Sequence, residues 1–271
     1  MPRLSRRPVV QSLMVCAMVL PAVWTLAQNQ TGPTAEEIVA RMLVRNSAQQ
    51  AALEQYVSVR TYRVEYTGTG GKHLGEIVVR AEYRAPDQKQ FVMISQSGSK
   101  FICEKVLRRL VDGEQEAMQK MNRMQTTLSA ENYDVELVGE EEIDGARAWV
   151  LKVQPRVVNK FTYRGRVWVN AQDYAVMRVM GEPAKSPSWW ISRTSFESRY
   201  VRRGEFWLPG QNVSTSHVRI GGEARLTIYY GAYETLVGKT VRGETEQGGV
   251  AGVKTMTELT VAKVPKDHLQ R

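Results

Sequence analysis

Cysteine and histidine are scarce in this sequence, with only two cysteines and three histidines among 271 residues. Cys16 lies in an N-terminal stretch that is predicted to be removed, so Cys103 alone would remain and no intramolecular disulfide could form. Cys103 is interpreted as a structural cysteine, because no base is visible near it. The three histidines have no metal-ligand spacing, which predicts a protein without a metal site.

Several patterns of enzymes and nucleic-acid-binding proteins are also missing. The sequence has no Gly-x-Ser-x-Gly element and no phosphate-binding glycine loop. The run Glu140–Glu142 is interpreted as a solvated acidic patch, because catalytic carboxylates must face each other at a controlled distance. We therefore predict no catalytic residue, no cofactor and no enzyme, with a hydrolase of unrecognised site as an alternative. No tight basic cluster is present, so no nucleic-acid partner is expected.

The first 27 residues have the features of a cleavable secretory signal. Basic residues come first, an apolar stretch runs from Val9 to Leu26, and the small residues Thr25 and Ala27 form a cleavage site. We predict cleavage after Ala27 and a soluble protein in the periplasm. A membrane anchor is the alternative, although the clean apolar run is short for a span.

The N-terminal segment also bears on two other properties, the acylation of Cys16 and the net charge after cleavage. Val15 precedes Cys16 and is not the small residue that a lipoprotein signal requires, so Cys16 is not expected to be acylated. Cleavage would remove three arginines from a chain with a formal net charge of +9. The remaining mild positive balance is compatible with anionic lipid surfaces or acidic partners, but a surface with no particular partner is the favoured interpretation.

Two segments have helical periodicity. Thr34 and Glu37 have capping-box spacing, and apolar residues then recur at helical spacing up to about Gln55. The second segment, residues 104–128, is predicted to form one or two helices inserted between strands, with a weak point or a break at Gly113.

Most of the remaining chain has strand character. Short segments rich in β-branched and aromatic residues alternate with turn signals, and Asp144-Gly145 is a hairpin turn of this kind. Residues 205–208 and 211–219 are predicted as separate strands, and residues 254–263 as a last one. We expect a mainly β (α+β) domain over residues 28–241, with ten or eleven antiparallel strands. Residues 242–271 would form a glycine-rich linker and a C-terminal strand or tail.

Four elements resemble the outer-membrane lipoprotein-sorting family, which is LolA/LolB-like and related to the RseB N-terminal domain, and the first of them is the opening helix with Thr34–Ile38. The segment from Tyr163 to Val179 contains a strand with Val167-Trp-Val-Asn170, a turn at Asp173-Tyr174 and a returning strand with an arginine. The segments GEFWLP (204–209) and RLTIYYGAY (225–233) resemble two further elements of that family. The resemblance covers residues 34–235.

This resemblance implies an unclosed antiparallel β-barrel of about eleven strands around a hydrophobic cavity, with helices as a lid. It implies a periplasmic carrier that binds a lipid or the acyl chains of a lipoprotein during lipoprotein sorting and outer-membrane biogenesis. An RseB-like envelope-stress sensor is the alternative. The expected partners are a lipid or acylated lipoprotein, and transiently a protein of the inner or outer membrane.

Large apolar side chains are the candidates for the ligand site. They could equally be ordinary core residues, and a slip of one residue would move each to the other face of its strand. The family's gating arginine has three candidates here, Arg60, Arg63 and Arg80. The predicted cavity wall is Tyr62, Val64, Phe91, Met93, Trp149, Leu151 and Trp168, and the predicted lid is Leu107, Leu110, Met118 and Met121.

Overall fold

The structure, a computed structural model, describes residues 32–117, 127–159, 161–186, 189–219 and 221–237. These residues form one antiparallel sheet and the helical elements α1 (Ala35–Ala52), η1 (Ile102–Leu107, a short π-helix) and α2 (Arg108–Ala117). The strands are β1 (Leu53–Gly68), β2 (Gly71–Arg84), β3 (Gln88–Gly98), β4 (Tyr133–Ile143), β5 (Ala146–Pro155), β6 (Tyr163–Asn170), β7 (Val176–Pro183), β8 (Ile191–Arg203), β9 (Phe206–Val218) and β10 (Glu223–Val237).

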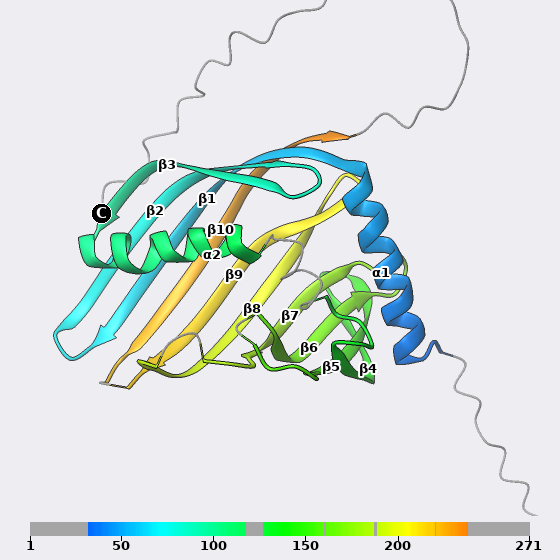
Figure 1. Cartoon of the computed structure of the whole chain (residues 1–271). Coiled ribbons are helices and arrows are strands. Elements are labelled where there is room, and N and C mark those ends of the chain that lie inside the picture. Colours follow the sequence, from blue (N-terminus) through cyan, green and yellow to red (C-terminus); the bar gives the residue numbers. More distant parts are fainter. Residues whose placement is uncertain (1–31, 118–126, 160, 187–188, 220, 238–271) are drawn as a thin grey trace, which may run out of the picture.

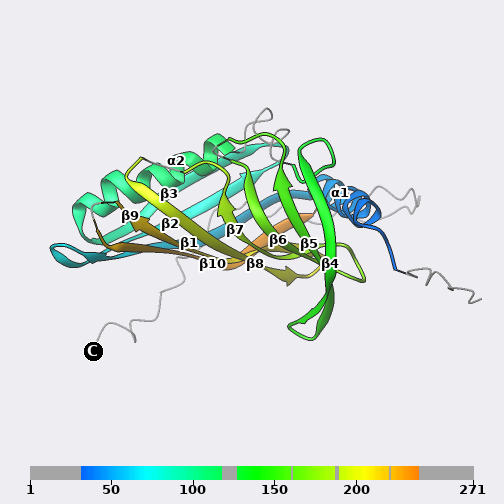
Figure 2. The same cartoon turned by 90° about the horizontal axis from the view of Figure 1, so that it is seen from below.

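The sheet is open. Its strand order is β3-β2-β1-β10-β9-β8-β7-β6-β5-β4, so β3 and β4 are its two edges and β1 pairs with β10 in the middle. Figures 1 and 2 show the sheet bent, with α2 inside the bend. The predicted unclosed half-barrel with a helical lid is therefore confirmed, with ten strands in the described part. The predicted signal peptide and the predicted strand at 254–263 lie outside the described residues.

One face of the sheet carries both helical elements, and we call it the inner face. Because side chains alternate along each strand, the residues aligned across neighbouring strands share a face. One such row links the two halves of the sheet through Tyr62, Ile228, Asn212, Ser198, Val179, Val167 and Leu151.

Helix α1 forms as its sequence predicts. The Thr34 side chain accepts from the Glu37 backbone, the Glu37 carboxylate accepts from the Thr34 N–H, and two orphan donors of the first turn are thereby satisfied. One stripe of the helix, which includes Ile38 and Met42, is buried against β4–β7. The opposite side remains exposed, as in the case of Val44.

The inserted helical segment lies against β1, β2 and β3. A Cβ atom at Gly75 would approach Ile102 Cγ2 to 2.5 Å, so glycine at this position lets η1 pack closely on β2. Cys103 belongs to η1, is buried against the sheet, and is a free thiol within the described ranges. Of the two interpretations of Gly113, the break is not found, since α2 continues through this residue. The cost of about 1 kcal/mol for a helical glycine is offset because the next residue, Glu114, is bound to the sheet.

The turn at Asp144-Gly145 is confirmed, since both residues have positive φ angles, 51° and 76°, as a two-residue hairpin requires. The predicted separation of residues 205–208 from 211–219 is wrong, because β9 is continuous through Pro209. Pro209 is tolerated because β10 pairs with β9 only over residues 211–217, so no sheet partner on that side needs its missing N–H.

Candidate functional site

A cavity of about 300 Å³ lies on the inner face beside α1. From the sheet side it is lined by Tyr163, Val167, Val176, Val179, Tyr200 and the nearby Leu128, and from α1 by Met42, Leu43, Asn46, Ser47 and Gln50, with Thr127 at its edge. The sheet side of the cavity is thus aliphatic and aromatic, while the exposed side of α1 supplies the polar groups. Such a mixture suits a ligand with an apolar body and a polar end.

Helix α1 is held over this cavity by contacts at its two ends. Arg41 donates to the Tyr174 hydroxyl at 2.7 Å. The Gln49 side-chain amide donates to the Trp207 carbonyl and accepts from the Trp207 N–H, each at 3.0 Å. This paired bond matters because the first residues of β9 have no β10 partner in the sheet.

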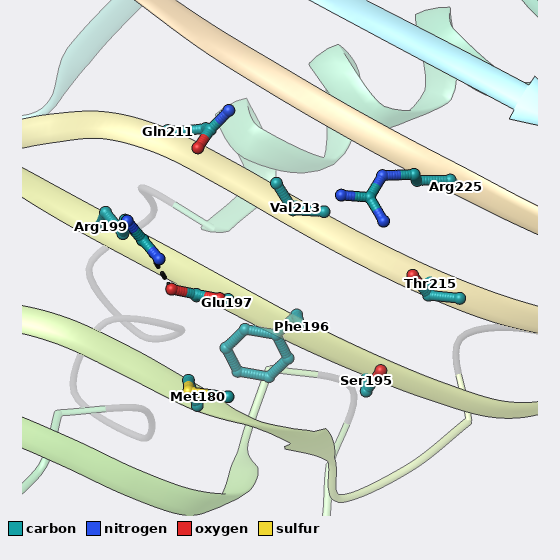
Figure 3. Close-up of a pocket in the computed structure, with 9 residues that line it drawn as sticks. All are labelled: Met180, Ser195, Phe196, Glu197, Arg199, Gln211, Val213, Thr215 and Arg225. Atoms are coloured by element: carbon teal, nitrogen blue, oxygen red, sulfur yellow. Dashed lines mark hydrogen bonds and ion pairs between the residues drawn. The ribbon is translucent and has the colours of Figure 1, made fainter.

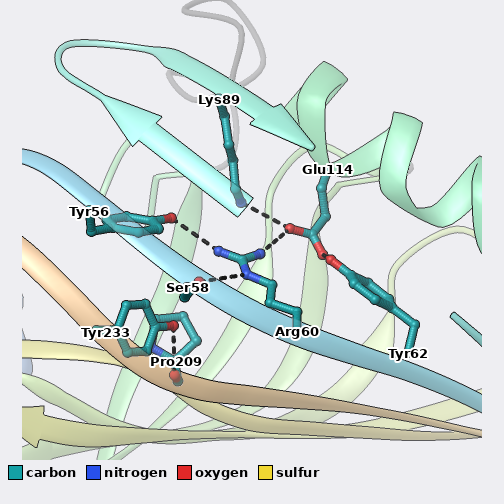
Figure 4. A network of polar contacts seen from close by, with 8 residues as sticks. All are labelled: Tyr56, Ser58, Arg60, Tyr62, Lys89, Glu114, Pro209 and Tyr233. Atoms are coloured by element: carbon teal, nitrogen blue, oxygen red, sulfur yellow. Dashed lines mark hydrogen bonds and ion pairs between the residues drawn. The ribbon is translucent and has the colours of Figure 1, made fainter. Parts of the chain in front are cut away.

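The other half of the inner face has a buried charged group in place of a cavity (Figure 4). The Arg60 side chain, only 1% exposed, donates to Glu114 at 2.8 Å. Glu114 also accepts from Lys89 at 2.9 Å and from the Tyr62 hydroxyl at 2.5 Å. Arg60 donates further to the Tyr56 hydroxyl. One carboxylate of α2 therefore binds side chains from β1 and β3.

The electrostatics of this group keep its main pair ionised. Burial alone would lower the pKa of Arg60, but the Glu114 carboxylate together with the neighbouring tyrosine hydroxyls outweighs burial and holds that pKa above its usual value. Burial alone would raise the pKa of Glu114, and Lys89 with Arg60 holds it below its usual value. The pKa of Lys89 is lowered, chiefly by burial. The remaining positive charge faces aromatic rings, with the Arg60 guanidinium 4.7 Å from the Tyr230 ring centre.

The strip of inner face between the two halves is polar. Asn212 donates to Ser198 at 2.6 Å, and Thr194 is hydrogen-bonded to Ser216 at 2.8 Å. All four side chains come from β8 and β9 and are half-buried. These hydroxyl and amide groups separate the apolar cavity beside α1 from the charged group beneath α2.

The predicted wall residues are divided between two places. The structure puts Trp149 and Leu151 in the buried cluster under α1, whereas the larger group lies on the α2 side of the inner face. That group consists of the predicted wall residues Tyr62, Val64, Phe91 and Met93, and the predicted lid residues Leu107 and Leu110 lie on the same side.

One predicted wall residue lies elsewhere. Trp168 is on the outer face, packed with Val150 and Met177, and its indole donates to Glu141 at 2.8 Å. The structure therefore does not bring Trp168 together with Trp149 and Leu151. The lid residues Met118 and Met121 lie outside the described residues.

The sequence analysis predicted neither the residues that line the cavity nor the role of Glu114 in α2. Val167 is one position away from the predicted residue Trp168, and only strand parity separates the two faces. Of the three arginines left open, Arg60 is buried on the inner face, while Arg63 and Arg80 are exposed and paired with neighbouring acids. No sequence spacing links Arg60 with Glu114, 54 positions later.

A second hollow, of about 400 Å³, lies mainly on the outer face across β7–β10 (Figure 3). It is larger than the cavity beside α1, but charged side chains dominate it. Glu197 accepts from Arg199 at 2.6 Å, and Arg225 extends toward Val213. Burial alone would raise the pKa of Glu197, and Arg199 and Arg178 hold it below its usual value. This hollow is unsuited to an acyl chain.

In the described ranges, no group of three or more metal-ligating side chains is gathered in one place. Among the helices described, none has the length and apolar character needed to cross a membrane.

Comparison with known proteins gives structural likenesses only. No protein-family model matches the chain, and neither does any curated protein. An outer-membrane lipoprotein-sorting protein domain from Vibrio parahaemolyticus matches with 11% identity and a TM-score of 0.41, over 78% of this chain and 95% of that one. A LolA superfamily protein from Nitrosomonas europaea matches with 12% identity and a TM-score of 0.32, over 75% of this chain and 94% of that one.

A complex of MucA and MucB from Pseudomonas aeruginosa contains a chain that matches with 12% identity and a TM-score of 0.26, over 71% of this chain and 93% of that one. The family that the sequence motifs resemble is thus found again among solved structures. The identities and TM-scores are low, so no residue role passes from those proteins to this chain.

Proposed function

We propose that this protein is a periplasmic carrier that binds a lipid, or the acyl chains of a lipoprotein, in the cavity between α1 and the inner face. The observation that supports this function is the apolar floor of that cavity, formed by Val167, Val176 and Val179 with two tyrosines. Removal of apolar surface from water is non-directional and contributes about 0.8 kcal/mol per buried CH₂. Such a floor therefore favours a flexible hydrocarbon chain over a polar ligand.

The volume of the cavity sets how much of a ligand it can hold. About 300 Å³ is at the small end of the range of ligand pockets, which is roughly 300–1,000 Å³. A longer or second chain would need more room along the inner face. The next space in that direction lies toward α2, where Arg60 and Glu114 hold the helix on the sheet.

Helix α2 is accordingly the proposed movable part. Its displacement would separate Glu114 from Arg60 and Lys89 and expose the Leu107 and Leu110 side chains. Each of these changes is unfavourable in water. Ligand uptake would offset the cost, so the closed arrangement is the expected state without ligand.

Partners and location follow from the same proposal. A carrier of acyl chains must receive them from one membrane and release them at another, so transient contact with a membrane protein is expected. The N-terminal segment up to Ala27 has secretory-signal features, which supports a periplasmic location. A direct test is native mass spectrometry of protein purified from the periplasm, followed by lipid extraction. We expect a co-purifying acyl species, and a protein that is always empty would contradict the carrier function.

The cavity itself is tested by a matched pair of variants on α1. Leu43 lines the cavity, whereas its neighbour Val44 is 71% exposed on the other side of the helix. We expect Leu43→Asp to weaken binding of a fluorescent fatty acid by tenfold or more, and Val44→Asp to leave it unchanged. Circular dichroism verifies that both variants are folded. Equal affinities for the two variants would contradict a ligand site beside α1.

A second pair avoids placing a charge next to the core. Ser47→Trp adds bulk at the edge of the cavity, and Ala48→Trp adds the same bulk one position further along α1. Only the first should lower the number of fatty-acid molecules bound per protein. If both variants bind the full amount, the ligand lies elsewhere.

A further inference from the structure

The two ends of the sheet differ in the charge of their turns. At one end, the connections β1–β2, β5–β6, β7–β8 and β9–β10 contain no Asp or Glu at all and include Arg156, Lys185 and Arg219. At the opposite end, the connections β2–β3, β4–β5, β6–β7 and β8–β9 contain no Lys or Arg. Their charged residues are Asp87, Asp144, Asp173 and Glu205.

The four basic turns are neighbours in space. The Tyr66 hydroxyl next to the β1–β2 turn donates to Gly221 in the β9–β10 turn at 2.9 Å. The Arg219 N–H of that turn donates to the Trp190 carbonyl in the β7–β8 loop at 2.8 Å. The Ala184 N–H of the same loop donates to the Thr162 carbonyl in the β5–β6 loop at 2.8 Å. Figure 1 shows the β1–β2 and β9–β10 turns together along the lower edge of the sheet.

Large apolar side chains are exposed at this same end. Trp189 is 68% exposed and Trp190 46%, and their rings are stacked with centres 3.6 Å apart. In the β5–β6 loop, Val157 is 61% exposed and Val158 62%. We call this set of turns the tryptophan end. Two exposed tryptophans side by side on a water-facing loop are costly to hydrate unless another surface covers them.

The charges at the tryptophan end are available to a partner. Lys185 and Arg219 are exposed, and neither takes part in an ion pair between described residues. Glu182, which adjoins the β7–β8 loop, is already bound to Arg164 at 2.9 Å. Arg156 is bound to Asp134 on the surface, where such a pair is worth about 1 kcal/mol or less.

We propose that the tryptophan end docks on the surface of an anionic lipid bilayer. Tryptophan rings are favoured at the level of lipid headgroups, because their apolar bodies are buried there while the indole N–H stays hydrated. Lysine and arginine beside them are attracted to anionic headgroups, and the acidic turns at the opposite end would face away from the bilayer. The cations and the exposed apolar side chains lie on several adjacent loops, and a bilayer interface binds both kinds of group along one broad surface.

This docking surface would serve the proposed carrier but does not depend on it. Tyr163 lines the cavity and is the first residue after the β5–β6 loop, so one edge of the cavity adjoins the docked end. Transfer of an acyl chain between cavity and bilayer would then occur over a short path. Binding to vesicles can nevertheless be measured on protein without ligand, so the two proposals can fail separately.

The test is co-sedimentation of the protein with vesicles of phosphatidylglycerol and phosphatidylcholine in equal amounts, and with vesicles of phosphatidylcholine alone. We expect binding to the anionic vesicles that weakens as salt is raised. The variant with Lys185→Gln and Arg219→Gln should bind about 30-fold more weakly. The variant with Trp189→Ser and Trp190→Ser should lose binding and the blue shift of tryptophan fluorescence that accompanies it.

A matched control makes the same charge change at the other end. Arg202 and Arg203 are exposed and precede the acidic turn at Gly204-Glu205. The variant with Arg202→Gln and Arg203→Gln should bind vesicles as the unaltered protein does. An equal loss in this control would show an effect of net charge alone and overturn the proposal. Absence of binding to anionic vesicles, or binding only to an acidic polypeptide such as polyglutamate, would also overturn it.

Discussion

The two helices cover the same face of the sheet, yet different contacts hold them there. Helix α1 buries a stripe of aliphatic side chains that includes Ile38 and Met42, and a cavity remains beside it. Helix α2 is joined to the sheet through the Glu114 carboxylate, which binds Arg60 and Lys89. Apolar packing adapts to ligands of varied shape, whereas a buried ion pair has one favourable geometry and breaks at a defined cost. Under the proposed function, the α1 half would accommodate the ligand and the α2 half would open.

The largest effect is expected at the charged group. Glu114→Ala would leave Arg60 buried without a carboxylate and should lower the free energy of unfolding by about 4 kcal/mol. The matched variant Glu104→Ala removes an exposed ion pair with Lys100 at 4.0 Å and should cost less than about 1 kcal/mol. Urea unfolding of the two variants measures both. Similar losses would show that α2 is not held mainly by charge.

A somewhat smaller effect is expected on the apolar side. Met42 is 1% exposed beneath α1, and Met42→Ala should lower the free energy of unfolding by about 3 kcal/mol. Val44→Ala, on the exposed side of the same helix, should change it by less than about 0.5 kcal/mol. Neither difference should depend on salt. A salt-dependent loss for Met42→Ala would remove the contrast between the two helices.

Acid should weaken the α2 half selectively. The pKa of Glu114 is held below its usual value of 4.5, so its pairing stabilises the fold above that value, and this stabilisation is lost as pH falls through the lowered pKa. The difference in unfolding free energy between the unaltered protein and Glu114→Gln should therefore be constant near neutral pH and shrink below pH 4.5. Urea unfolding across that range measures it. A difference that stays constant down to the acid limit would contradict a charge-based attachment.

The smallest effect concerns the first turn of α1. Thr34→Ala removes the capping bond to Glu37 and should cost about 1 kcal/mol, whereas Thr34→Ser keeps the hydroxyl and should cost less. Thermal unfolding of the two variants, at one protein concentration, provides the comparison. Because this cap lies on the α1 half, fatty-acid affinity should change with it more than with Glu104→Ala.

Local patterns were enough to predict most of the fold. The capping box at Thr34, the Asp144-Gly145 turn and the strand segments all depend on neighbouring residues, and the structure contains each of them. The errors have local causes as well. Gly113 and Pro209 usually interrupt elements, but Glu114 binding and the missing β10 pairing let α2 and β9 continue.

The candidate site was harder to predict because it depends on parity and on distant partners. Trp168 and Val167 are adjacent in β6, yet only Val167 faces the cavity. The sequence offers large aromatics as candidates, but the register that decides their faces is set by pairing with β5 and β7. Rules based on sequence spacing cannot predict the Arg60–Glu114 pair, because 54 positions separate the two residues.

The pairing of β1 with β10 also has a consequence for how the chain acquires its fold. Leu53 is opposite Val237, so the strand at the start of the sheet is completed by the last described strand. Pairing β1 with β10 closes a long loop, and the entropy lost in closing it is compensated only after the new contacts have formed. Proteins with such non-local pairings are among the slow folders. Because the chain is synthesised from its N-terminus, the β1–β2 and β2–β3 hairpins could form early. The two halves of the sheet join only once β10 is available. If the protein is exported as proposed, this delay would keep the chain in a partly unfolded form that a translocation channel can accept.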